Sequence, residues 1–453
     1  MKDYIERGFM TLPLRNARIL LSEGSSLSAR QAITTLGLRG YELEICDPDP
    51  FCIGRFSRFV RRFHRCPALG KDPKAYLRFI VNLISARRFD VLLPMHEQGF
   101  LFARAQEQIA PFVHIALPSF ENYETALNKS NFSRLLSELD LQQPRTTFAR
   151  TVQELLELRH FPLVLKSSIG TASRGVLMVE NFAELTRAAA ELEHSQAFDD
   201  LVLVQQKVSG PLERAQAVFS RGSLIGIHGY RQAVVGAGGG DAVKESVSRP
   251  EVRAHLAQIG RRLAWNGALS VDYILQDGTP LYIDCNPRLV EPVNALLSGV
   301  DLADLLVRIS LGESPLPAAN GHEGTRTHMA ILALLGCSIR SGSRREVLRE
   351  CRRLMLGCDP YTNSREELTP ISLDRLSLVP LAIVAMVLLG SPKAARGMSV
   401  DTARSHQLNP QSVRIIRENH TCFQNVPLSQ RRPPGDPRSE SRSNQNFEWN
   451  GTA

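Results

Sequence analysis

Residues 268–288 read ALSVDYILQDGTPLYIDCNPR, and this stretch decides the fold of the chain. Two apolar runs flank Asp277 and Gly278, a dipeptide typical of tight hairpin turns. The pattern predicts two antiparallel strands, with Asp272 in the first and Asp284 in the second. Asn286 follows Asp284 by two positions, and side chains two apart on a strand share one face.

Two carboxylates and one amide oxygen form a set of hard oxygen donors that suits Mg²⁺ bound to substrate phosphates. We therefore predict that Asp272, Asp284 and Asn286 hold Mg²⁺, with Mn²⁺ as an alternative ion. Arg288 would place a fixed positive charge beside a transferring phosphoryl group. Cys285 should point to the opposite face, so we expect it to pack rather than react.

Upstream, a second strand pair carries a lysine and a loop rich in glycine and serine. Residues 161–168 (FPLVLKSS) predict a strand that contains Lys166, and residues 176–180 (VLMVE) predict the next strand. The connecting residues 170–175 (GTASRG) lack the GK[ST] ending of a Walker A loop. Backbone N–H groups of such a hairpin can still wrap phosphates, although an ordinary hairpin would have the same composition.

The first part of the chain alternates between strand and helix patterns, which is typical of an open α/β sheet. We predict strands at residues 17–22, 41–46 and 90–94 and a helix at residues 27–38. The turn GSSLS lacks the GxGxxG fingerprint, so dinucleotide binding is not supported. Residues 55–65 (RFSRFVRRFHR) suggest either nucleic-acid binding or a surface helix with a buried aromatic edge, and the helical spacing favours the helix.

Composition limits the classes of protein that the chain can belong to. The chain has 453 residues, 43% hydrophobic and 22% charged, as in soluble globular proteins. The net charge of +8 suits an anionic small substrate as well as a nucleic acid, and we predict no nucleic-acid partner. The eight cysteines form no CxxC pair and the N-terminus lacks an apolar signal region, so we expect a reduced, cytoplasmic protein.

The last part of the chain is expected to be mostly helical over residues 319–424, with a disordered tail at residues 425–453. Helical patterns occur at residues 343–356 and 410–418. Residues 376–390 (LSLVPLAIVAMVLLG) carry no charge, but 15 residues are too few to span a bilayer. We interpret them as a core helix that begins near Pro380, with docking on a membrane surface or a partner protein as the alternative.

Together the motifs resemble the ATP-grasp superfamily, in the family's order, over about residues 15–318. The resemblance implies a first nucleotide lysine, Lys129 in NKSNF, and a second, Lys166 in VLKSS. It also implies a small loop, GTASRGV, that closes over the phosphates and a hinge, VQQKVSG, that contacts adenine through its backbone. The further nucleotide residues that it implies are Gly170, Ser173, Gly175, Gln205, Gln206, Lys207 and Val208, with Glu213 for the ribose hydroxyls.

The resemblance further implies a domain order and an activity. Residues 1–115 are similar to the pre-ATP-grasp α/β domain of biotin carboxylase and carbamoyl-phosphate synthase, and residues 116–318 to an ATP-grasp α+β domain. The implied enzyme is an ATP-dependent ligase that joins a small-molecule carboxylate to an amine through an acyl phosphate. Arg231 and Arg288 would hold the carboxylate and the oxyanion that forms when the amine attacks.

Two alternatives remain open at this level. One is carboxyphosphate chemistry like that of carbamoyl-phosphate synthase, and the other is a nucleotide-binding regulator without turnover. Many relatives have Glu at the position of Asp272, and most have Glu at that of Asp284, so each carboxylate here sits one methylene closer to the backbone. The identity of the substrates and the formation of a homo-oligomer are not determined by the sequence.

Overall fold

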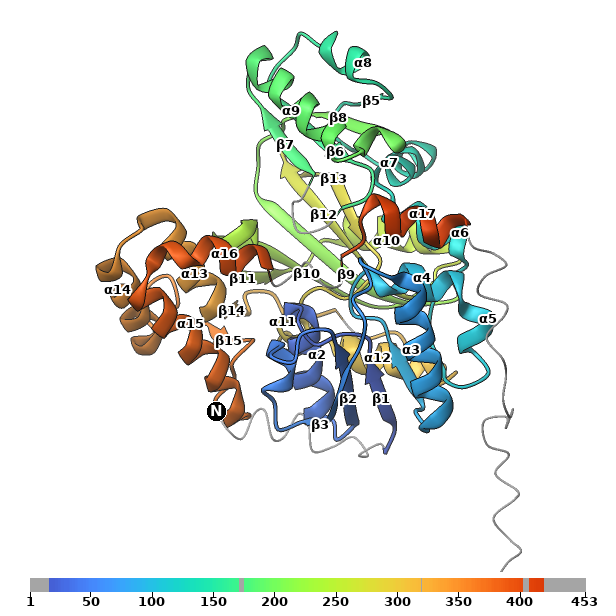
Figure 1. Ribbon diagram of the computed structural model, residues 1–453, viewed down its shortest axis with the longest axis vertical. Helices are drawn as coiled ribbons and strands as arrows, with labels where there is room; N and C mark the ends of the chain where they lie inside the picture. Colours follow the sequence, from blue (N-terminus) through green and yellow to red (C-terminus); the bar gives the residue numbers. More distant parts are fainter. Residues whose placement is uncertain (1–15, 171–174, 319, 402–406, 419–453) are drawn as a thin grey trace, which may run out of the picture.

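The computed structural model describes residues 16–170, 175–318, 320–401 and 407–418. Within them the strands form three sheets, with the orders β3-β2-β1-β4, β13-β12-β9-β10-β11-β14-β15 and β5-β8-β6-β7. Figure 1 shows the first sheet at the bottom, the second in the middle and the third at the top. The predicted α/β class is confirmed.

The first sheet is parallel throughout, and its strands are β1 (Arg18–Leu21), β2 (Glu42–Asp47), β3 (Val60–Arg65) and β4 (Val91–Leu93). Helix α2 (Leu27–Leu38) connects β1 to β2, and Ser26 caps it by accepting from the N–H of Ala29. Helix α3 (Pro73–Ala86) precedes β4. The predicted strands and the predicted helix of this region are confirmed to within two residues.

The prediction of a surface helix at residues 55–65 is wrong, because this segment forms the edge strand β3 after a short 3₁₀ turn. Phe59 and Phe63 are four residues apart, and that spacing keeps side chains on one face of a strand as well as of a helix. Both rings pack on the core around α2, and the Arg55 guanidinium lies 5.0 Å from the ring centre of Phe63. Hydrogen bonds to β2 select the strand.

The central sheet is antiparallel from β13 to β14, with β15 added in parallel. Its strands are β9 (Leu212–Ser220), β10 (Ser223–Val235), β11 (Asp241–Val247), β12 (Gly267–Gln276), β13 (Thr279–Asn286), β14 (Arg326–His328) and β15 (Arg365–Glu366). Helix α10 (Pro250–Arg262) covers one face, where Leu256 and Ile259 pack with Phe219 and Val271. Helices α6 (Phe120–Leu127), α7 (Lys129–Glu138), α11 (Pro292–Leu297) and α12 (Leu302–Ser310) flank the same sheet.

The third sheet has its own small core and stands above the central sheet (Figure 1). Its strands are β5 (Thr146–Ala149), β6 (Leu163–Ser167), β7 (Val176–Val179) and β8 (Val202–Gln206), and its helices are α8 (Val152–Leu156) and α9 (Phe182–His194). Strands β6 and β7 pair antiparallel, so the predicted hairpin on either side of residues 170–175 is confirmed.

The C-terminal helices occupy two separate places. Helices α13 (Ala330–Ser341), α14 (Arg344–Leu356), α15 (Leu378–Gly390) and α16 (Ala395–Asp401) pack together on the left of Figure 1. Helix α17 (Pro410–Glu418) lies instead beside α4 (Gln98–Arg104), and its Val413 and Ile416 join the core of the N-terminal part. The region predicted as one third unit is therefore divided in space, and the predicted tail at residues 425–453 lies outside the described residues.

A buried ion pair ties the C-terminal helices to the first sheet. The guanidinium of Arg30 in α2 lies 3.0 Å from Oδ2 of Asp374, and both side chains are fully buried. The Ser57 hydroxyl and the backbone N–H of Arg58 also donate to Asp374. One carboxylate thus holds three donors from the N-terminal part of the chain.

Helix α15 is the apolar run of residues 376–390, and it begins two residues before Pro380. Only Val384 and Leu388 are buried, so the prediction of a core helix is correct for one edge of the helix and wrong for the rest. No helix in the described parts of the chain is long and apolar enough to cross a membrane.

Candidate active site

The two carboxylates of the β12–β13 hairpin lie side by side, as the sequence predicts. Asp272 and Asp284 are directly paired across the two strands, and Asn286 is paired with Ser270. Cys285 is buried in the core on the α10 side, as expected from strand alternation. The turn at Asp277 and Gly278 has positive φ at both residues and sets the register from Gln276 to Tyr273, and a register shift after Tyr273 brings Asp272 opposite Asp284.

Asp272 has an oxygen that fits a cation. Its Oδ2 lies 3.3 Å from Nε of Arg214, whereas its buried Oδ1 has no hydrogen-bond partner among the described residues. Burial raises the pKa of Asp272; Arg214 opposes this rise and Asp284 adds to it. A divalent cation at Oδ1 would compensate the cost of burial and the repulsion between the two carboxylates.

The donor set is small. The described residues contain no group of three or more His, Cys, Asp or Glu side chains placed to hold a metal ion. Two carboxylates with the amide of Asn286 would be the protein donors to a metal ion at this place, and such a set would leave positions for phosphate oxygens and water. The residues present fit Mg²⁺ bound together with a nucleotide.

Two lysines converge on the end of β13 from different elements. The Nζ atom of Lys129, the first residue of α7, lies 3.0 Å from Oδ1 of Asp284 and donates to the Gly170 carbonyl at 2.8 Å. Asn128 caps this helix by accepting from the two N–H groups after Lys129, and this cap fixes Lys129 as the first residue of the helix. The Nζ atom of Lys166 in β6 donates to the Ile283 carbonyl at 2.7 Å. The third sheet and the central sheet thus meet at these side chains.

The electrostatics of Lys166 follow from its surroundings. Its side chain is almost completely buried. Burial lowers the pKa of Lys166 to about 8, Asp284 and Asp272 act in the opposite direction, and Lys129 lowers it further. A phosphate bound beside Lys166 would raise the pKa of its ammonium and stabilise the charged form, as expected of a lysine that binds phosphate.

The glycine-rich loop and the hinge border the same junction. Gly175 has φ +71°, and a Cβ atom there would lie 2.0 Å from the Ser167 hydroxyl oxygen, so only glycine fits. Ser173 lies outside the described residues. In the hinge, Gln205 is buried and donates to the Thr146 hydroxyl at 3.1 Å, whereas Gln206 is exposed.

The hinge backbone is partly occupied. The N–H of Lys207 donates to the Pro162 carbonyl at 3.3 Å, and its ammonium pairs with Glu180 at 2.7 Å. An adenine ring at the hinge would therefore contact the Lys207 carbonyl and the backbone of Val208.

The structure does not bring Glu213 and Arg231 to this site. They are cross-strand partners on β9 and β10, where Arg231 lies 2.8 Å from Glu213. On its other side Glu213 is paired with Tyr273 of β12, and the residues preceding Tyr273 and following Glu213, Asp272 and Arg214, are paired at the next register position. Because successive strand residues face opposite ways, Glu213 and Arg231 lie on the α10 face and Asp272 lies on the other.

Because Glu213 and Arg231 lie on the face of the sheet opposite Asp272, the expected contacts of Glu213 with the ribose and of Arg231 with the substrate do not fit the structure. Glu213 is fully buried, and it also accepts from Arg249 at 2.8 Å and from the Tyr273 hydroxyl at 3.1 Å. Burial tends to raise the pKa of Glu213, but the hydrogen bonds and charges of Arg249 and Arg231 hold it below its usual value. Motif order fixed the place of these residues along the chain but not the face of the sheet.

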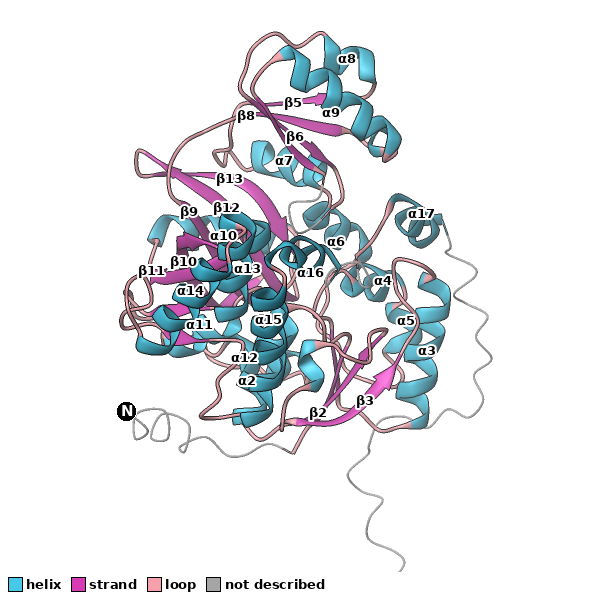
Figure 2. Cartoon of the chain, turned by 60° about the vertical axis from the view of Figure 1, so that its left-hand side comes forward, coloured by secondary structure: helices cyan, strands magenta, loops and turns pink. Residues whose placement is uncertain are grey.

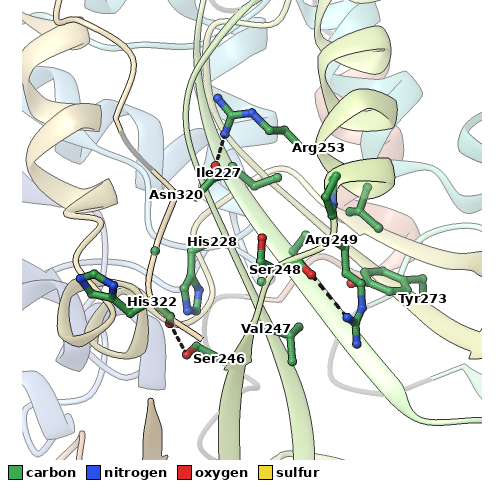
Figure 3. Close-up of a pocket in the computed structure, with 15 residues that line it drawn as sticks. Ile227, His228, Ser246, Val247, Ser248, Arg249, Arg253, Tyr273, Asn320 and His322 are labelled. Atoms are coloured by element: carbon green, nitrogen blue, oxygen red, sulfur yellow. Dashed lines mark hydrogen bonds between the residues drawn. The ribbon is translucent and has the colours of Figure 1, made fainter. Parts of the chain in front are cut away.

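A pocket of about 100 Å³ lies beside this second group, as Figure 3 shows. Arg249, Arg253, Tyr273 and His322 are among its lining residues, and Arg253 donates to Asn320 at 2.9 Å. The pocket is therefore on the α10 side and is separate from the paired carboxylates.

Arg288 lies at the edge of the site. Its guanidinium donates to the Ser28 hydroxyl at 3.2 Å, and its N–H donates to the Asn286 carbonyl at 2.8 Å. The end of the metal hairpin therefore contacts the start of α2 in the first sheet.

Sequence reasoning missed a buried polar cluster on the metal face. Lys244 of β11 lies 2.7 Å from Oε2 of Glu291 and 2.7 Å from Oε2 of Glu367, and Gln31 of α2 donates to both carboxylates. The ring centre of Tyr230 lies 5.5 Å from the Lys244 ammonium, and the buried Tyr230 hydroxyl has no hydrogen-bond partner among the described residues. Residues from four separate parts of the chain make this cluster, so no local pattern could reveal it.

Comparison with known proteins agrees with this geometry. Residues 126–292 match the ATP-grasp domain. The carbamoyl phosphate synthase large chain of Pasteurella multocida is 27% identical over 216 residues, which cover 45% of this chain and 20% of that protein. The arginine-specific large chain of Bacillus subtilis is 24% identical over 324 residues, covering 68% of this chain and 30% of that one. This chain thus spans a fifth to a third of these relatives.

Solved structures share the fold at low identity. The biotin carboxylase domain of Hydrogenobacter thermophilus 2-oxoglutarate carboxylase, in complex with MgADP, ADP and bicarbonate, has a TM-score of 0.56 and 17% identity over 68% of this chain and 73% of that one. L-amino acid ligase from Bacillus licheniformis has a TM-score of 0.51 and 18% identity over 67% and 76%. Residues 126–292, which carry both lysines and both carboxylates, match the ATP-grasp domain, so the chain contains an ATP-grasp domain.

Proposed function

We propose that this protein is an ATP-dependent ligase that joins a carboxylate to an amine. The observation that carries the proposal is the convergence of Lys129 and Lys166 on the paired carboxylates Asp272 and Asp284, with Lys129 3.0 Å from Asp284. Two lysine ammonium groups and two carboxylates that could bind a metal ion lie together at the junction of two sheets, and this arrangement suits a nucleoside triphosphate bound with its metal ion.

Each part of the site has a task in this proposal. Lys129 and Lys166 pair with phosphate oxygens, and the loop around Gly170 and Gly175 covers them. The buried Gln205, with Gln206, Lys207 and Val208, borders the adenine ring. Mg²⁺ or Mn²⁺ held by Asp272, Asp284 and Asn286 would neutralise phosphate charge.

The reaction needs no nucleophile from the protein. An oxygen of the substrate carboxylate attacks the γ-phosphorus, the bond from that phosphorus to the bridging oxygen of ADP breaks, and an acyl phosphate forms. The amine then attacks the acyl carbon, phosphate leaves, and the amine loses a proton as the amide forms. The chain's part is to hold the reactants in line and to offset charge, for which Arg288 lies at the end of the metal hairpin.

Phosphorylation of bicarbonate is the second candidate, because the sequence relatives are carbamoyl phosphate synthase large chains. It shares the first step and differs in the small acid that attacks the phosphorus. We also propose a cytoplasmic location; the seven cysteines of the described residues are free thiols, as in a reducing compartment.

The test is phosphate release from ATP with mixtures of carboxylates and amines, followed by mass spectrometry of the products. Hydroxylamine added in place of the amine should trap the acyl phosphate as a hydroxamate. An amide product supports the ligase, and release that depends on bicarbonate alone supports the second candidate. ATP binding without product in any mixture would identify a regulator and reject both.

A further inference from the structure

Helix α15 is apolar on every side, yet most of it faces water. Its sequence LVPLAIVAMVLLG has no charged residue. Val384 and Leu388 pack into the core of the C-terminal helices. The exposed side chains are Leu378, Val379, Ile383, Met386 and Val387, together with Leu376 just before the helix, and Met386 is 65% exposed. We call these six residues the apolar patch.

The apolar patch is continuous along one side of the helix. Residues 376, 379, 383, 386 and 387 recur at intervals of three and four, which places them on one helical stripe. Helix α14 packs beside α15 and exposes three more apolar side chains, Leu348, Met355 and Leu356. Figure 1 shows both helices on the left side of the molecule, and Figure 2, in which that side is turned forward, shows them facing the viewer. Exposed apolar surface of this extent marks a binding surface.

The charges around the apolar patch are basic. Helix α14 contains five arginines and two glutamates, and the glutamates are engaged in ion pairs with Arg349 and Arg353. Arg345 and Arg352 are exposed and have no ion-pair partner in the part of the chain that the structure describes. Arg375 and Lys393, both exposed, stand before and after α15. Asp374, the nearest acid before the helix, is buried with Arg30.

This distribution of charge selects the occupant. In a symmetric dimer the same surface meets itself, so these four basic side chains would approach their copies without acidic partners of their own. An anionic membrane supplies the missing negative charge over an extended plane. The 13 residues of α15 are too few to cross a bilayer, but they suit a helix that lies in the interface.

We propose that the face formed by α14 and α15 docks this protein on an anionic lipid surface. The apolar patch enters the boundary between headgroups and acyl chains, and Arg345, Arg352, Arg375 and Lys393 contact the headgroups. The candidate active site lies where the central and third sheets meet, whereas α14 and α15 lie on the left of Figure 1, so the docked protein would keep its nucleotide site away from the membrane.

The experiment is co-sedimentation of the full chain with vesicles of phosphatidylcholine alone and of phosphatidylcholine mixed with phosphatidylserine. We expect binding to the mixed vesicles that weakens as salt is raised. Arg345→Glu combined with Arg352→Glu should lower the partition coefficient by at least roughly twenty-fold, since each basic side chain near such a surface contributes about fivefold.

Met386→Glu tests the apolar part without entering the core, because this side chain is largely exposed. This variant should lower the partition coefficient at least about tenfold, since a charged carboxylate would have to enter the apolar part of the lipid interface. Leu316→Glu is the matched control; Leu316 is 87% exposed in the loop after α12, and its variant should bind like the wild type. The thermal midpoint and the ATP affinity of both variants should equal those of the wild type.

Three outcomes would overturn the proposal. The first is no binding to the mixed vesicles, or equal binding to both kinds. The second is equal loss of binding in Met386→Glu and Leu316→Glu, or loss in neither. The third is a dimer in analytical ultracentrifugation that Met386→Glu dissociates while the protein ignores vesicles, which would assign this face to a second copy of the chain. None of these outcomes bears on the ligase activity.

Discussion

The ammonium of Lys129 lies 3.0 Å from a carboxylate oxygen of Asp284, so a helix N-terminus and a strand end are joined by an ion pair at the candidate active site. In the proposed function Lys129 binds a phosphate oxygen and Asp284 binds the metal ion. The pair therefore holds the site together without ligand and must rearrange when nucleotide and metal enter.

Asp284→Asn should abolish turnover while leaving the unliganded protein stable. The variant loses the partly exposed pair with Lys129, which contributes at most about 1 kcal/mol, and it also loses the repulsion from Asp272. We expect phosphate release to fall at least about a hundredfold, an unchanged thermal midpoint without ligand, and a weaker response of the ATP-bound midpoint to magnesium. Wild-type turnover would remove Asp284 from the site.

Lys166→Ala should weaken ATP binding about ten- to a hundredfold, because a charged hydrogen bond to phosphate contributes about 1.5–3 kcal/mol. Titration calorimetry gives the affinity directly. Lys207→Ala is the control, since the Lys207 ammonium pairs with Glu180 at the surface, and we expect an affinity close to the wild type. Equal affinities for all three proteins would contradict the phosphate assignment.

ATP affinity should also fall as the pH rises above about 8. Burial lowers the pKa of Lys166 to about 8, so the free protein loses this charge at a pH where an ordinary lysine keeps it. One pH unit higher, about a tenth of the molecules carry the charge and the apparent affinity falls about tenfold. Binding should take up a proton, which calorimetry in buffers of different ionisation enthalpy detects. Lys166→Arg should remove the proton uptake.

Arg231→Met should leave turnover within about threefold of the wild type, because Arg231 lies on the face of the sheet opposite Asp272. Glu213→Gln should instead lower stability by about 1–3 kcal/mol, since Arg231, Arg249 and Tyr273 would lose the negative charge and one of the two acceptor oxygens that they share. Denaturant unfolding and phosphate release separate the two effects. A loss of turnover in Arg231→Met at unchanged stability would restore its substrate role.

Stability should decrease as the pH rises from about 5 to 9, and Glu367 should account for part of the decrease. Burial raises the pKa of Glu367 to about 8; Lys244 opposes this rise and Glu291 adds to it. A carboxyl whose folded pKa exceeds its unfolded value contributes stability below the unfolded pKa, and this contribution is lost as the pH passes the folded pKa. Glu367→Gln keeps the shape and should flatten the profile of thermal midpoint against pH. An identical slope in both proteins would exclude this carboxyl as the source.

Local patterns predicted the parts of the fold that local chemistry controls. The turn at Asp277 and Gly278 predicted the hairpin that carries Asp272 and Asp284 on its two arms, and a local register shift between Asp272 and Tyr273 then places the two carboxylates opposite each other. The helix at residues 27–38 was also predictable, because its first residue follows the capping serine directly. In these cases the determining interactions lie within a few residues of chain.

The errors arose where distant strands decide the outcome. The face occupied by Glu213 depends on its pairing with β10 and β12, and the second of these lies some 60 residues further along the chain. Residues 60–65 form a strand because they pair with the edge of β2, and their own spacing does not encode this pairing. The contact of Lys244 with Glu367 spans 123 positions. No turn or cap marks such contacts in the sequence.

The pair of Arg30 with Asp374 has a consequence for the modularity of the chain. The recognisable family region ends at residue 292, but a guanidinium buried near the start of the chain has its countercharge 82 positions beyond that end. Removing one member of a fully buried pair costs about 3–5 kcal/mol. A C-terminal segment exchanged for one from another protein with an ATP-grasp domain would have to bring its own acid to this point. The unit that can be inherited or transplanted is therefore longer than the unit that sequence comparison detects.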